Sequence, residues 1–211
     1  MIRIAPSLLS ADFGSLKDEI ASVTEAGADL LHLAVMDGHF VPNLTFGPFI
    51  VEAIRRVTEL PLDVHLMITD PLTYGPQFAS AGADIVTFHV EADQDPDAVL
   101  DRIEAKGAKG GMVVNPDTDI RRLEPWLPRC AMVLVMSVFP GFAGQKFIAE
   151  VLPKIPTLRN DLGFSGDVEI DGGIGPATAP AAREAGANVL VAGSAIFGSA
   201  DRAATIQRLR G

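Results

Sequence analysis

Two histidines and one aspartate have the residue types and the surroundings of a metal site. His32 and His65 each lie in a short apolar run of strand length, and Asp171 ends a third such run, Val168–Asp171. Burying an imidazole or a carboxylate among apolar residues is unfavourable unless the group is paired or binds a metal. One buried histidine alone is more often a hydrogen-bonded core residue, but three such groups at matched depths favour ligation. Two imidazoles and a carboxylate suit a divalent transition metal such as Zn²⁺, Mn²⁺ or Fe²⁺.

The alternation of side chains along a strand determines which neighbours share this site. Successive side chains point to opposite faces, so His32 shares a face with Ala34, and His65 shares a face with Asp63. If both faces look into a barrel, the imidazoles converge near the carboxyl ends of the strands, and Asp171 approaches from nearly the opposite wall. Ala34 is the unexpected residue, because a methyl group can neither bind a metal nor carry a proton.

Strand-length apolar runs that alternate with segments of helical period must position these groups. Helical stretches such as Gly47–Val57, Asp97–Ala105 and Lys146–Arg159 separate the runs. Near-continuous apolar strands are typical of a parallel sheet that is buried on both faces. An open doubly wound sheet would show the same alternation, but eight βα units favour an α/β fold of the closed TIM (β/α)8 type. The predicted strands are Ile2–Ser7, Leu30–Met36, Leu62–Met67, Ile85–His89, Gly111–Val114, Met132–Val138, Val168–Asp171 and Val189–Ala192.

A repeated phrase supports this periodicity. Glu25–Asp29, Ser80–Asp84 and Glu184–Asn188 each contain Ala-Gly-Ala and each precede a predicted strand. Glycine just past a helix end can adopt the left-handed conformation that terminates the helix. The same connector between helix and strand is therefore predicted three times.

Composition narrows the class of protein. With 211 residues and 48% hydrophobic content, one domain over residues 1–211 is the simplest interpretation. The net charge is −10 and no segment rich in Lys and Arg occurs, which argues against nucleic acid as a partner. No apolar stretch is long enough to span a bilayer, so no membrane partner is expected. The single cysteine, Cys130, fits a reducing compartment, and we expect a cytoplasmic location.

Three glycine-containing turns follow the last three predicted strands. They are Pro140–Gly144, Asp171–Ile174 and Gly193-Ser194. Glycine lets backbone N–H groups close around an anion, and the loops after strands seven and eight are the usual phosphate site of this barrel. The turns therefore predict phosphate binding. The other two histidines, His39 and His89, are assigned to loop structure or hydrogen bonding.

The most specific signals are motifs that cover essentially the whole chain. They are Ile4–Phe13, Val35–Asn43, Asp63–Met67, Val135–Ser137 with Pro140–Phe142 and Gly144–Phe147, and Asp171–Ile174 with Ala192–Ile196.

In this order the motifs resemble the ribulose-phosphate 3-epimerase family. The resemblance implies a metal-dependent barrel that interconverts D-ribulose 5-phosphate and D-xylulose 5-phosphate by C3 proton transfer through an enediolate, and it implies a homo-oligomer. It makes His32, His65 and Asp171 metal ligands, with Zn²⁺ favoured, and makes Asp171 an acid/base carboxylate. The residues implied to contact the phosphosugar are Ser7, His65, Gly141, Phe142, Ala143, Gly144, Asp171, Gly172, Gly173, Gly193 and Ser194.

The chain departs from the family pattern at Ala34. The pattern has aspartate two residues after the first histidine, both as a metal ligand and as the second acid/base group. Positioned acid/base catalysis contributes roughly 10²–10⁴-fold, so we expect severely reduced or absent activity. Asp37 lies past the strand end and is not expected to substitute. Phe139 and Ala143 also differ from the family pattern, which affects the expected substrate preference. Ala34 is either an engineered change or a natural divergence.

Two alternatives remain open. A related 3-epimerase acting on allulose 6-phosphate would use the same scaffold. A non-catalytic phosphosugar-binding protein would keep the phosphate turns after losing the chemistry.

Overall fold

A computed structural model describes all residues 1–211 and confirms the TIM barrel. Its eight parallel strands lie in the order β1-β8-β7-β6-β5-β4-β3-β2. The bridge between Ser7 and His32 joins the two end strands. The strands are β1 (Arg3–Pro6), β2 (Leu31–Met36), β3 (Leu62–Met67), β4 (Ile85–His89), β5 (Lys109–Val114), β6 (Met132–Met136), β7 (Asp167–Asp171) and β8 (Val189–Ala192).

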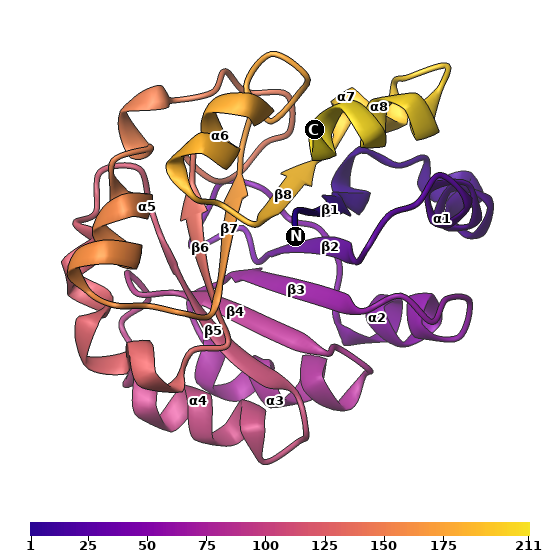
Figure 1. The fold of residues 1–211 in the computed structure, drawn as a ribbon. Helices are drawn as coiled ribbons and strands as arrows, with labels where there is room; N and C mark the ends of the chain where they lie inside the picture. The colour runs from indigo at the N-terminus through magenta and orange to yellow at the C-terminus, as the bar shows by residue number, and fades with distance from the viewer.

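Helices surround the strands on the outside (Figure 1). They are α1 (Leu16–Glu25), α2 (Pro48–Arg55), α3 (Pro71–Ser80), α4 (Pro96–Glu104), α5 (Lys154–Pro156), α6 (Ala179–Ala185), α7 (Ser194–Phe197) and α8 (Arg202–Arg210). Short 3₁₀ segments occupy Leu8–Ser10, Phe13–Ser15 and Ala149–Val151, a longer one occupies Ile120–Arg129, and Thr157–Asp161 is a π-helical turn. No helix of the structure has both the length and the apolar character needed to cross a membrane.

The two faces of the strands have different roles. The larger core cluster, of 47 buried residues, includes Leu31, Leu33 and Val35 of β2. The alternate residues of β2, His32 and Ala34, point to the opposite face, into the barrel. The barrel interior therefore contains the polar groups that the apolar strands carry.

The predicted connectors are confirmed. Gly27, Gly82 and Gly186 have φ values of 91°, 111° and 110°, and each lies just after a helix and before a strand. The predicted helix Lys146–Arg159 is wrong as a continuous element, because the segment is broken into 3₁₀, α and π turns. Pro153 and Pro156 interrupt it, since proline has no N–H to donate to the preceding turn.

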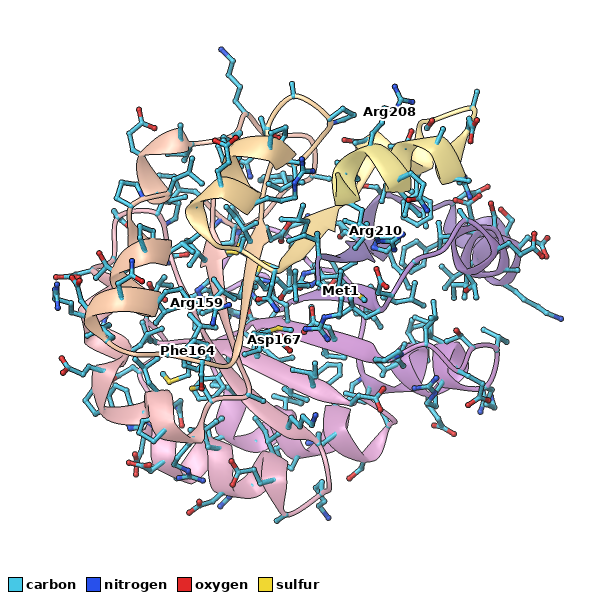
Figure 2. All side chains as sticks on the ribbon, in the orientation of Figure 1. Met1, Arg159, Phe164, Asp167, Arg208 and Arg210 are labelled. Carbon is cyan, nitrogen blue, oxygen red and sulfur yellow. The ribbon has the colours of Figure 1, made fainter.

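Arginine side chains tie together the amino ends of the strands (Figure 2). Arg159 donates to the Gly166 carbonyl at 2.6 Å and to Asn188 Oδ1 at 2.9 Å, next to the starts of β7 and β8. Arg210 donates to Asp29 Oδ2 at 2.7 Å. In this fold the amino end serves stability and the carboxyl end carries the chemistry.

Candidate functional site

His32 of β2, His65 of β3 and Asp171 at the end of β7 come together inside the barrel. Each offers one potential ligand atom, and the three atoms lie within 4.8 Å of one another. His32 Nε2 is 3.6 Å from Asp171 Oδ2, and the two imidazole centroids are 5.5 Å apart. The structure thus brings together three side chains that are far apart in the sequence.

The free ring nitrogens of these histidines fit a metal ion. His32 Nδ1 is 2.5 Å from Asp63 Oδ2, and His65 Nε2 is 2.9 Å from His89 Nε2. The other nitrogen of each ring, His32 Nε2 and His65 Nδ1, is buried and has no hydrogen-bond partner. Buried polar atoms are rarely left without a partner. A histidine that binds a metal through one nitrogen commonly hydrogen-bonds through the other, and both rings have that arrangement.

Ala34 occupies the position beside these donors. It pairs with His65 in the β2–β3 ladder, so its methyl group points to the same face as that imidazole. Its side chain is only 3% exposed and packs with Met36, Val41 and Met67. The site has no carboxylate at this position.

Asp37 does not replace the missing group. It follows the end of β2, and its Oδ1 accepts hydrogen bonds from the backbone N–H groups of His39 and Phe40 at 2.8 Å each. Its Oδ2 accepts from the backbone N–H and the hydroxyl of Thr69 at 2.8 and 2.9 Å. Burial acts to raise its pKa, but these donors lower the pKa of Asp37 to about 2.

Two buried carboxylates stand behind His32. Asp63 and Glu169 are both fully buried, and Glu169 Oε1 is 3.7 Å from His32 Nδ1. Burial disfavours charge on His32, but the Asp63 and Glu169 carboxylates raise its pKa well above 6.5. Burial and the Asp63 charge raise the pKa of Glu169 to about 8, and the contact with His32 acts in the opposite direction.

Sequence reasoning placed Asp63 on the face of His65 but gave no role to either carboxylate. The available signal was an acidic residue at alternate positions of an apolar strand, as in Asp63 before His65 and Glu169 before Asp171.

The environment of Asp171 favours proton transfer. Burial raises the pKa of this carboxyl group, His32 acts in the opposite direction, and the Asp63 charge raises it further. The side chain is 22% exposed, so the carboxylate can reach a ligand from inside the protein. A carboxyl group with a raised pKa is suited to acid/base work near neutral pH.

A cavity of about 360 Å³ opens at the carboxyl ends of the strands, above these groups. His32 and His65 are fully buried and do not form part of its lining. Ala34, Met36, Met67 and Met136 line it. Its wall includes Ser7, Gly141, Phe142, Ala143, Gly144, Asp171, Gly172, Gly173, Gly193 and Ser194.

Two adjacent glycines shape the wall. Gly172 and Gly173 have φ values of 123° and 63°, a region that side chains other than glycine rarely adopt. A Cβ on Gly172 would lie 2.7 Å from the Val138 backbone nitrogen, and one on Gly173 would lie 2.6 Å from that of Phe147. The loop after β7 therefore packs against the loop after β6 only because both residues lack side chains.

The two remaining histidines have separate places. His39 is exposed, and its Nδ1 contacts the Asp37 carbonyl oxygen at 2.9 Å. His89 ends β4, is buried, and contacts His65. Its assignment to hydrogen bonding agrees with the structure, although its contact with a candidate ligand was not predicted.

Comparisons with known proteins agree on one family. The model of the Ribulose-phosphate 3 epimerase family matches residues 3–197. Ribulose-phosphate 3-epimerase of Bacillus subtilis (strain 168) is 51% identical over 215 residues, which covers 100% of this chain and 99% of that protein. Ribulose-5-phosphate-3-epimerase, chloroplastic, of Arabidopsis thaliana is 47% identical and is aligned over 99% of this chain and 76% of its own length.

Solved structures with low sequence identity share the fold. KGPDC from Streptococcus mutans superposes with a TM-score of 0.73 at 17% identity, covering 100% of this chain and 96% of the other. The 3-hexulose-6-phosphate synthase from Salmonella typhimurium superposes with a TM-score of 0.72 at 18% identity, covering 99% and 96%. At this identity the likeness concerns the barrel alone.

Proposed function

The chain belongs to the ribulose-phosphate 3-epimerase family, and from this membership we propose that its barrel carries a metal-dependent 3-epimerase site for D-ribulose 5-phosphate and D-xylulose 5-phosphate. We propose further that Ala34 leaves this site inactive or severely impaired. The observation that carries the proposal is the convergence of His32 Nε2, His65 Nδ1 and the Asp171 carboxylate at a glycine-walled cavity.

Inversion at C3 requires proton handling on both faces of the carbon. One group must remove the proton next to the carbonyl, and another must deliver a proton to the opposite face. Asp171 supplies one such group, with a raised pKa that suits the transfer. Ala34 lines the same cavity and supplies none. The chain therefore has half of the acid/base pair that an inversion needs.

His32, His65 and Asp171 would hold the metal ion, for which Zn²⁺ is favoured over Mn²⁺ and Fe²⁺. When bound, a divalent cation would stabilise the negative charge that develops on the substrate oxygen. Asp63 holds the His32 ring in place through the 2.5 Å contact with Nδ1. Without a carboxylate at position 34, the metal would have only three protein ligands.

The loops after β6, β7 and β8 would hold the phosphate. Gly141, Gly144, Gly172 and Gly173 line the cavity and have positive φ values, which lets their backbones approach a ligand closely. Asn43 Nδ2 donates to the Gly141 carbonyl at 2.7 Å and fixes the first of these loops. Ser7, Gly193 and Ser194 complete the wall from β1 and β8.

Exchange of the C3 proton with solvent deuterium tests the function directly. Ribulose 5-phosphate is incubated in D₂O with the native chain or with Ala34→Asp, with Zn²⁺ or Mn²⁺ added, and C3 deuteration is followed by NMR. We expect roughly 10²–10⁴-fold faster conversion to xylulose 5-phosphate, seen in the same spectra, with Ala34→Asp than with the native chain. Rapid conversion by the native chain would contradict the proposed impairment, whereas deuteration without conversion would be one-sided exchange by Asp171.

A non-catalytic phosphosugar-binding protein is the second candidate. It is favoured by the buried methyl group of Ala34 in a cavity whose glycine wall is intact. Tight binding of ribulose 5-phosphate together with no turnover by Ala34→Asp would support it. A substrate panel that includes allulose 6-phosphate, run on Ala34→Asp, separates the pentulose and hexulose enzymes.

We also propose that the chain forms a homo-oligomer. Leu44 and Phe49 are 73% and 70% exposed and, with Phe13 and Tyr74, line an apolar groove of about 920 Å³. This groove adjoins the candidate cavity, with which it shares Leu9 and Met36. Exposed apolar patches of this kind are typical of protein interfaces. Light scattering on the native chain and on Phe49→Asp tests this assembly. A cytoplasmic location stays a prediction.

A further inference from the structure

A line of hydrogen bonds leads from His65 to a carboxylate outside the candidate site. His65 Nε2 is 2.9 Å from His89 Nε2, and His89 Nδ1 is 3.1 Å from Glu91 Oε2. Both imidazoles are almost fully buried. The proposed reaction gives no role to His89 or Glu91. Together they provide the hydrogen-bond partner of His65 Nε2, the ring nitrogen that does not face the metal site.

Glu91 is held firmly in this arrangement. Its Oε1 accepts a hydrogen bond from the Asn115 backbone N–H at 2.8 Å and another from the Thr118 hydroxyl at 2.5 Å. Burial acts to raise its pKa, but contacts with His89, Thr118 and Asn115 lower the pKa of Glu91 to about 2. The side chain is therefore an ionised carboxylate that only accepts hydrogen bonds.

The position of each proton follows from this acceptor. Because the Glu91 carboxylate accepts, His89 Nδ1 carries a hydrogen. His89 is 1% exposed, and burial disfavours a positive charge on its ring, so the neutral ring has a lone pair on Nε2. The short contact between the two Nε2 atoms holds one proton, so His65 Nε2 donates it. That leaves the lone pair of His65 on Nδ1, which is the ring nitrogen without a protein partner.

We propose that Glu91, acting through His89, is a positioning residue that fixes His65 in the tautomer whose Nδ1 lone pair is available to a metal ion. The part of this inference that concerns metal affinity rests on the proposed function. The tautomer itself is a property of the metal-free protein. A histidine ligand is generally oriented by the partner of its second nitrogen, and here that partner is another histidine whose own tautomer is set by a carboxylate.

The substitution Glu91→Gln should reverse the direction of the hydrogen bonds along Glu91, His89 and His65, with little change in side-chain volume. The Asn115 N–H can only donate, so it holds the amide oxygen of the glutamine on its side. The NH₂ group then faces His89 Nδ1, which must accept. The hydrogen of His89 moves to Nε2 and is donated to His65 Nε2, and His65 is left with its hydrogen on Nδ1.

NMR of ¹⁵N-histidine-labelled, metal-free protein measures these tautomers. In the native chain we expect the nitrogen shifts of His65 to show a protonated Nε2 and a bare Nδ1. In Glu91→Gln we expect the opposite pattern, and in the exposed control Glu150→Gln the native pattern. A hydrogen on Nδ1 of His65 in the native chain would overturn the proposal without need of any variant. An unchanged His65 pattern in a folded Glu91→Gln protein would also overturn it.

Calorimetric titration with Zn²⁺ alone measures the consequence. We expect Glu91→Gln to weaken zinc binding by about 10- to 100-fold, the usual range for loss of an outer partner of a metal ligand. Glu150→Gln should leave the affinity unchanged. Equal affinities for the native chain and Glu91→Gln would contradict the effect on the metal. If the native chain bound no Zn²⁺, the proposed metal site would be contradicted. The NMR experiment would still test the proposed tautomer of His65.

Discussion

Ala34 lies directly opposite His65 in the β2–β3 ladder, and its methyl group points into the same cavity as the Asp171 carboxylate. A side chain at position 34 therefore lies next to one candidate ligand and faces another. Ala34 packs against Met36 and Met67 in a small buried cluster. The position supplies neither a ligand nor a proton carrier.

Metal affinity should rise when a carboxylate is placed at this position. We expect Ala34→Asp to bind Zn²⁺ at least about tenfold more tightly than the native chain, a difference of about 1.4 kcal/mol. Ala34→Asn is the matched control, because it has nearly the same size and no charge. Titration calorimetry gives both constants. Identical affinities for the Asp and Asn variants would show that position 34 does not contribute a charged ligand.

Asp171 should be essential once the second carboxylate is present. In an Ala34→Asp background, we expect Asp171→Asn to reduce kcat by roughly 10²–10⁴-fold, because an amide cannot exchange the C3 proton. The measurement is steady-state turnover of ribulose 5-phosphate with saturating metal. Asp117→Asn, a change in an exposed loop, should leave kcat as it is. Substantial turnover without Asp171 would assign the acid/base role to another group.

Crowding at the cavity wall can be separated from backbone strain with two glycines of similar conformation. Gly173 has φ 63° and Gly163 has φ 66°, but a Cβ meets the Phe147 backbone only at Gly173 and has no neighbour within 4 Å at Gly163. Left-handed strain costs roughly 1–2 kcal/mol for either alanine. We expect Gly173→Ala to lower the free energy of unfolding by more than Gly163→Ala in urea titrations. It should also weaken phosphosugar binding, whereas Gly163→Ala should not. Equal effects of the two variants would remove the crowding argument.

Asp37 should stabilise the protein only above acidic pH. Its folded pKa of about 2 is below its ordinary value of 3.8, so its contribution is present above about pH 4 and is lost as the pH falls toward 2. Asp37→Asn should therefore have a lower Tm than the native chain at pH 7, and the difference should shrink between pH 4 and pH 2. Thermal melts across this range test the prediction against Asp93→Asn, an exposed control. A difference that does not vary with pH would mean that the charge of Asp37 is not the cause.

The barrel could be predicted from the sequence because strands that are buried on both faces are apolar along their whole length. Such runs are visible in the local composition. β3, β4 and β8 have the predicted bounds, β1 is one residue shorter at each end, and the other strands differ by one or two residues at one end. Periodicity alone predicts a continuous helix where prolines in fact interrupt it. Lys146–Arg159 has helical periodicity, but Pro153 and Pro156 remove hydrogen bonds that a continuous helix needs.

The sequence by itself determined which donor groups the strands carry, namely His32, His65 and Asp171, and that position 34 has none. Only the tertiary structure decided how those donors are presented. Strand register pairs Asp63 with His32, and His89 reaches His65 from two residues beyond its register partner Thr87. These contacts select the ring nitrogen that each histidine leaves free. Local sequence cannot contain this information, because each contact joins residues 24 or 31 positions apart and depends on how neighbouring strands align around a closed barrel.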